Sequence, residues 1–141
     1  MSDVALSLIL LDGTSSTRVE NVTSVVAADA SGQFGLLPGH DALVTVLEPG
    51  LFRYRQAYKT HWSYGACVGG LLSCSRTLDR TTQVRIVSRR FLHGDQPEVL
   101  QTRLDELLQR EGMLRVSTRE SRERLDLAFY KRMQQFSQTQ T

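Results

Sequence analysis

The sequence is poor in cysteine and tryptophan and has no long apolar run, and these shortages exclude several classes of protein. Its 141 residues include two cysteines, Cys67 and Cys74, which are too few for a disulfide scaffold and suit a reducing compartment. The longest apolar runs, such as residues 8–11, are far shorter than the ~20 residues that span a bilayer. The first residues, MSDVALSL, have no basic region followed by an apolar stretch, so we expect no signal peptide.

Excess charge of one sign is also missing. The 17 basic and 15 acidic side chains give a formal net charge of +2, which does not indicate a nucleic-acid-binding protein. The sequence does have an ordinary globular composition, with 40% hydrophobic and 23% charged residues. A chain of this length and composition is expected to form one domain, or one small domain with an appendage.

Residues 1–92 have the pattern of an all-β domain. Turn signals recur about every eight to twelve residues, which is typical of a sandwich or barrel. Residues 51–58 alternate, with Phe52 and Tyr54 on one face and Arg53 and Arg55 on the other, as in a half-buried strand. We expect about eight to ten short strands. They include residues 4–11, 19–28, 42–47, 51–58, 61–67, 70–74 and 82–87.

From residue 95 the periodicity changes to that of helices, so we expect a second region over residues 95–141. Pro97 suits the first turn of a helix, and Leu100 and Leu104 then fall on one helical face. Gly112 is a suitable end for this helix. The letters STRE at 117–120 fit a capping box that begins a second helix. The sequence therefore predicts a β domain followed by a helical hairpin.

Catalytic chemistry is not indicated. The three histidines, His40, His61 and His93, are far apart and share no helical face with a carboxylate. Cys67 and Cys74 do not have the spacing of zinc ligands and are interpreted as buried free thiols. We expect no enzyme activity, no cofactor and no metal site.

The most unusual segment is residues 32–50, GQFGLLPGHDALVTVLEPG. Its Pro-Gly pairs at 38–39 and 49–50 are suited to type II turns, in which glycine supplies a positive φ. Two interpretations stay open from these residues alone. The loop exposes Phe34, Leu36 and Leu37 beside His40 as a partner contact, or these side chains pack inward and the glycines serve the turns.

This segment resembles the corresponding stretch of the epsilon subunit of rotary ATP synthases. The letters VGGLLSC at 68–74 and VRIV at 84–87 resemble that family's later Gly-Gly hairpin and last strand. The resemblance implies a β sandwich of about ten strands followed by a C-terminal antiparallel two-helix hairpin. It also implies a non-catalytic rotor subunit of the central stalk, involved in ATP synthesis and ion transport.

The same resemblance implies the partners and the place of the protein. The gamma subunit and the c-ring would be bound by the loop, and the complex would hold the chain on the cytoplasmic face of a bacterial energy-transducing inner membrane. The expected contact residues are Gln33, Phe34, Pro38, Gly39, His40 and Asp41. Gln33 stands where the family often has an acid, so it keeps the hydrogen bonding and loses the charge.

The helices are a candidate brake on ATP hydrolysis, because family members use an extended helical state to block it. The cations that would contact the alpha and beta catalytic subunits are Arg119, Arg122, Arg124, Lys131 and Arg132. A solvated helical face with internal ion pairs such as Glu120 with Arg124 is the other interpretation. Family members that bind ATP carry an arginine and an alanine where Leu108 and Gln109 stand here, so ATP binding is not expected.

A small β-barrel that binds single-stranded nucleic acid is the alternative function. Tyr54, Tyr58, Trp62 and Tyr64 could stack on bases, and Arg53, Arg55 and Lys59 could contact phosphates. The other interpretation of these rings is cross-strand packing on a sheet face. We favour the rotor subunit, with no nucleic acid among its partners.

Overall fold

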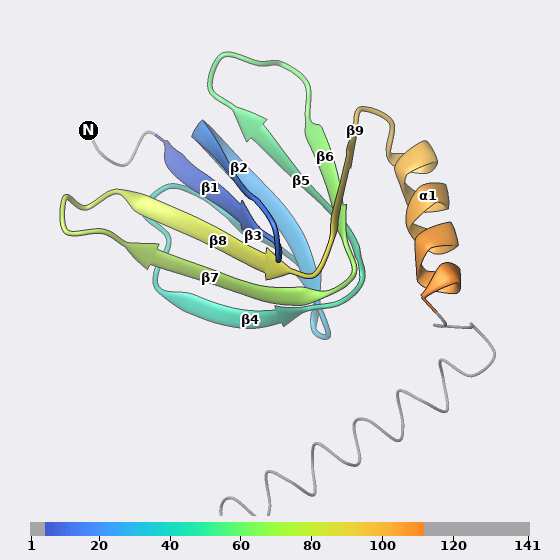
Figure 1. Ribbon diagram of the computed structural model, residues 1–141. Helices are drawn as coiled ribbons and strands as arrows, with labels where there is room; N and C mark the ends of the chain where they lie inside the picture. Colours follow the sequence, from blue (N-terminus) through green and yellow to red (C-terminus); the bar gives the residue numbers. More distant parts are fainter. Residues whose placement is uncertain (1–4, 112–141) are drawn as a thin grey trace, which may run out of the picture. The chain divides into compact units, whose positions relative to one another are not determined.

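The computed structural model describes residues 5–111, which form nine strands and then one helix (Figure 1). The predicted β-rich fold and first helix are confirmed, and the predicted second helix lies outside the described residues. The strands are β1 (Leu6–Leu11), β2 (Ser16–Asp29), β3 (Gly32–Leu36), β4 (Leu43–Leu47), β5 (Gly50–Gln56), β6 (Ser63–Cys67), β7 (Gly70–Arg76), β8 (Thr82–Ser88) and β9 (Phe91–Gly94), and the helix is α1 (Pro97–Arg110).

The strands form two layers that share β2. Hydrogen bonding follows the order β1-β8-β7-β4-β2-β5-β6-β9, β3 pairs with β2, and β1 also pairs with β2. The first half of β2 therefore lies beside β1, and its second half lies between β3 and β5. β1 and β8 are the parallel pair, with Leu6 opposite Thr82. In Figure 1 the long β2 runs from one layer to the other.

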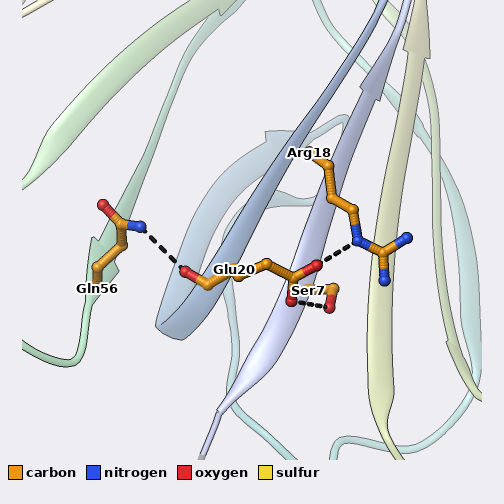
Figure 2. A network of polar contacts seen from close by, with 4 residues as sticks. All are labelled: Ser7, Arg18, Glu20 and Gln56. Carbon is orange, nitrogen blue, oxygen red and sulfur yellow. Dashed lines mark hydrogen bonds and ion pairs between the residues drawn. The ribbon is translucent and has the colours of Figure 1, made fainter.

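β2 bends where it changes layers. Asn21 has a φ of 59°, and the pairing register shifts on both sides of this point, as in a β-bulge. Glu20 holds the bend: its carboxylate accepts hydrogen bonds from Arg18 and from the Ser7 hydroxyl, the latter at 2.7 Å. Its backbone carbonyl accepts a 3.0 Å bond from the Gln56 amide of β5 (Figure 2). Three strands are thus tied together at one residue.

The core lies between the layers and is aliphatic. Residues 6–10 of β1 are buried on both faces of the strand, with Ser7 among them at 3% exposure. In β5 the predicted alternation is confirmed, since Phe52 is 3% exposed and its ring meets Phe91 edge-on at 6.1 Å between centroids. The buried cluster consists of Leu6, Leu8, Leu10, Val22, Val25, Ala27, Leu36, Leu47, Phe52, Cys67, Leu72, Cys74, Val84 and Ile86.

Three local features differ from the expectations. The segment 32–36 is a strand rather than part of a turn, and β9 is an additional short strand paired with β6. The turn at residues 12–15 is built on Asp12, whose carboxylate accepts hydrogen bonds from the backbone N–H groups of Thr14 and Ser15 at 2.8 and 2.7 Å. A positive φ is found at Gly39 but not at Gly50, which begins β5, so the second of the two predicted turns is wrong in type.

The chain divides into two compact units, Met1–Leu104 and Asp105–Thr141. The first turns of α1 belong to the first unit, and there Leu100 is buried, with its Cδ1 3.6 Å from where a Cβ on Gly94 would stand. The helix begins at Pro97, whose fixed φ suits a helix and whose missing N–H would have no helical hydrogen bond to make in the first turn. The organisation expected from the sequence, a sandwich over 1–92 and a hairpin over 95–141, stays a prediction.

Candidate docking surfaces

The loop between β3 and β4 contains a turn that is hydrogen-bonded to the β7–β8 hairpin. The backbone N–H of His40 bonds to the carbonyl of Leu37 at 3.1 Å, and Gly39 has a φ of 87°, so the predicted type II turn at 38–39 is confirmed. Gly39 donates to the hydroxyl of Thr82 at 2.7 Å and accepts from the Arg76 guanidinium at 2.8 Å. The turn is therefore held on both sides by β7 and β8 before any partner arrives.

The predicted contact residues are not gathered in one place. Gln33 lies near the start of β3, roughly 10 Å from its end at ~3.3 Å per residue, and Pro38 to Asp41 follow after that end. Gln33 and Asp41 are exposed, whereas Pro38, Gly39 and His40 are half-buried. Of the three apolar side chains of the loop, two pack inward and one is exposed. Phe34 packs partly on the core and Leu36 is fully buried in it, while Leu37 is 59% exposed.

An apolar row on the outer face of β4, β7 and β8 was missed by sequence reasoning. Val46, Leu71 and Val87 are directly opposite one another in the pairing registers and are 69, 45 and 44% exposed. Val44 extends the row along β4 at 67% exposure, toward the loop that carries exposed Leu37. We call Val44, Val46, Leu71 and Val87 the apolar face. Only the strand registers reveal it, because each residue taken alone is typical of a core position.

A cationic cluster lies on the outer face of the other layer. Arg53 and Arg55 point away from the buried Phe52, and both guanidinium carbons lie over the Trp62 ring, at 4.6 and 4.5 Å from its centroid. The Nε atoms of the two arginines are buried and have no hydrogen-bond partner among residues 5–111. Next to them, Arg53, Tyr64 and Gln33 line a cleft of about 240 Å³.

The aromatic rings proposed for the nucleic-acid alternative do not share one face. Tyr54 packs on the core, where burial raises the pKa of its phenol, and Trp62 is covered by the two guanidinium groups. Tyr58 is 68% exposed in the segment between β5 and β6. A stacking platform needs rings with free faces along one groove, and this arrangement does not supply it.

The buried thiols have the environment of structural cysteines. Cys67 and Cys74 are free and buried, as the sequence predicts, and burial raises the pKa of both thiols.

Within residues 5–111 no three side chains of the metal-binding types come together, and none of the described helices is long and apolar enough to cross a membrane. The candidate inhibitory residues Arg119, Arg122, Arg124, Lys131 and Arg132 lie outside the described range.

The described strands thus form a β-sandwich with an apolar patch on one outer face and a cationic cluster on the other. Residues 5–92 match the family model described as "ATP synthase, Delta/Epsilon chain, beta-sandwich domain". This match covers more than half of the sequence, and the chain belongs to that family.

Named relatives agree with the family. The chain is 49% identical over 53 residues to "ATP synthase epsilon chain 2" of Cereibacter sphaeroides, which covers 38% of this chain and 36% of that protein. It is 35% identical over 57 residues to "ATP synthase epsilon chain 1" of Syntrophotalea carbinolica, covering 40% and 41% of the two chains. The aligned parts therefore span well under half of these relatives.

Among solved structures, the chain is similar to a chain of the Euglena gracilis mitochondrial ATP synthase, seen by cryo-EM with OSCP, F1 and c-ring. The TM-score is 0.57 at 20% identity, and the likeness covers 73% of this chain and 63% of that one. At this identity the likeness shows the fold alone.

Proposed function

We propose that the protein is the epsilon subunit of a rotary ATP synthase, a non-catalytic part of the central stalk that joins the gamma subunit to the c-ring. Membership of the delta/epsilon family and the epsilon chain names of its bacterial relatives support this role. Its place is then peripheral, on the cytoplasmic face of a bacterial energy-transducing membrane. The chemistry of ATP belongs to other subunits.

The observation that carries the proposal is the apolar face. Val46, Leu71 and Val87 form a continuous row over three strands. Exposing a row of branched apolar side chains to water costs free energy, and covering the row with a partner lowers the free energy. In a rotor subunit the shaft-forming gamma subunit is the partner that must be held firmly. We assign the apolar face to gamma.

The loop residues are assigned to the foot of the stalk. Pro38, Gly39 and His40 are held by Thr82 and Arg76, so the turn presents a preformed shape to gamma and the c-ring. Gln33, Phe34 and Asp41 complete the proposed contact set, with exposed Gln33 offering an uncharged amide to a polar loop of the ring.

Co-purification with a tagged gamma subunit tests the proposal. We expect the full chain to be retained, and the double variant Val46→Ser/Leu71→Ser to lose at least about tenfold in affinity, because two apolar side chains of the contact are removed. The matched control is Leu78→Ser/Val99→Ser, which changes two exposed apolar residues away from that face.

The control should be retained as the unchanged chain is. If the unchanged chain does not co-purify with gamma, the rotor role is wrong. If both double variants are retained equally, the apolar face is not the gamma contact. Thermal melts of each variant distinguish lost binding from lost folding.

A further inference from the structure

The cationic cluster of Arg53, Arg55 and Trp62 has the features of a second binding site. The two arginines alternate with Phe52 and Tyr54 on β5, so their side chains leave the same face of the strand roughly 7 Å apart. Trp62, just before β6, lies against both guanidinium groups. Its ring restricts where the two cations can go, and so holds them as a fixed pair.

This pair lacks a counter-charge in the described part of the chain. Neither guanidinium makes an ion pair or donates a hydrogen bond there, and both Nε atoms are buried without a partner. Two neighbouring like charges repel each other, and an anion bound to both relieves that repulsion. Lys59 and His61 lie on the wall of the adjoining hollow of about 590 Å³, where Asp95 is the acidic residue. The surface is thus arranged for an anion from outside this domain.

The chemical class of that anion follows from which N–H groups and ring faces of the cluster are still free to bind it. Each guanidinium still presents its outer N–H groups, which match the two oxygens of a carboxylate. Both arginines use the Trp62 ring, so it is not offered to a nucleobase, and Tyr54 is packed on the core. Carboxylates two residues apart on a strand, or three to four apart on a helix, have roughly the spacing of the two cations.

We propose that Arg53 and Arg55, held by Trp62, form a docking site for an acidic segment of a protein partner, which places two carboxylates on the two guanidinium groups. The site lies on a different layer from the apolar face, so the partner segment is bound in addition to whatever covers Val46 and Leu71. The inference takes from the proposed function only that the chain works in a multisubunit assembly.

The test uses the full chain and a fluorescein-labelled peptide that contains two Glu-Ala-Glu triplets. Fluorescence anisotropy gives its affinity, and Trp62, the single tryptophan of the sequence, reports contact by its emission. We expect the peptide to bind and to shift this emission, and a peptide with glutamine at every glutamate to bind at least about tenfold more weakly. Rising salt should weaken the glutamate peptide's binding.

Arg53→Gln/Arg55→Gln should lose at least about tenfold in affinity for the glutamate peptide. The matched variant Arg80→Gln/Arg85→Gln removes the same charge from the β7–β8 hairpin and should stay within about twofold of the unchanged chain. Equal losses in the two double variants would show unspecific attraction to a basic protein and overturn the site.

Two further results would overturn it. One is no binding of the glutamate peptide by the folded chain, and the other is tighter binding of a fifteen-residue oligothymidine that is lost in Arg53→Gln/Arg55→Gln. Melting curves confirm that each variant is folded. A failure here leaves the proposed function standing, because retention on gamma is tested on the apolar face.

Discussion

Glu20 is a surface carboxylate with an unusual number of contacts for its position. It lies next to Asn21, whose positive φ marks the bend of β2, and it bonds to Ser7 of β1 while Gln56 of β5 bonds to its backbone. The bond to Arg18 first, and that to Ser7 next, lower the pKa of the Glu20 carboxyl from its ordinary value of 4.5. The charged form therefore favours the folded chain.

Replacing Glu20 by glutamine should make stability less sensitive to acid. Since the pKa of Glu20 is lower in the folded chain than in the unfolded one, its contribution is fully present above the unfolded pKa and is lost as pH falls through the folded pKa. We expect the unchanged chain to exceed Glu20→Gln in free energy of unfolding at pH 7, and the difference to shrink below about pH 4.5. Urea denaturation across this range measures it.

Salt and a second variant check the cause. The side chains of Arg18 and Glu20 are 57 and 53% exposed, so about 0.5 M salt should reduce the difference at pH 7. The control is Glu106→Gln on α1, an exposed carboxylate without a hydrogen bond or ion pair among the described residues. A pH dependence of the same size in both variants would contradict the role given to Glu20.

At the scale of strands, two glycines allow neighbouring elements to approach. A Cβ on Gly65 of β6 would lie 2.4 Å from the Phe52 ring of β5, and one on Gly70 of β7 would lie 2.0 Å from the carbonyl oxygen of Val87 on β8. The first obstacle is a side chain and the second is backbone. Gly70 therefore permits the β7–β8 pairing itself through a close approach of the two backbones.

Alanine at these two positions should destabilise the sandwich by different amounts. Gly65→Ala is expected to cost about 1–3 kcal/mol, and part of this should return with Phe52→Leu. Gly70→Ala should cost more, because the backbone of β8 must move. Gly13→Ala serves as the control, since no atom lies within 4 Å of its added Cβ. Urea denaturation of these variants gives the order, and Gly70→Ala milder than Gly65→Ala would refute it.

Elements with a strong local pattern could be predicted, and those made by distant pairing could not. The alternation of Phe52 and Arg53 identified β5, and Pro97 with the leucines after it identified α1. β9 has four residues, which form a strand because β6 lies beside them. For the same reason the apolar face was missed: Val46 and Leu71 are far apart in sequence, and only the register makes them neighbours.

For the whole molecule, the C-terminal region is where a brake on hydrolysis is proposed. Removing residues 112–141 takes away the candidate cations Arg119 to Arg132 and leaves α1 with its buried Leu100 and Leu104. This cut is cleaner than removal of 95–141, which would also uncover the surface beneath those leucines. It separates loss of the brake from damage to the sandwich.

We expect the assembled synthase with the shortened chain to hydrolyse ATP faster, severalfold, and to retain the chain on gamma. The physical reason is that the shortened chain lacks the cations that, in the candidate brake, would meet acidic surface on the alpha and beta subunits. ATPase rates of matched preparations measure this. The full-length variant with glutamine at Arg119, Arg122 and Arg124, which removes three positive charges, should also hydrolyse ATP faster. Unchanged ATPase rates in both variants would refute the brake.

The parallel pairing of β1 with β8 has a consequence for how the protein is made. Residues 6–10 leave the ribosome well before residues 82–87, which are their partner on one side. Until β8 is synthesised, the edge of β1 that pairs with it has unpaired backbone groups. Such an edge can pair with another chain, and the long separation in sequence slows folding. Nascent chains halted before residue 82 should therefore depend on chaperones, and release from them should coincide with the emergence of β8.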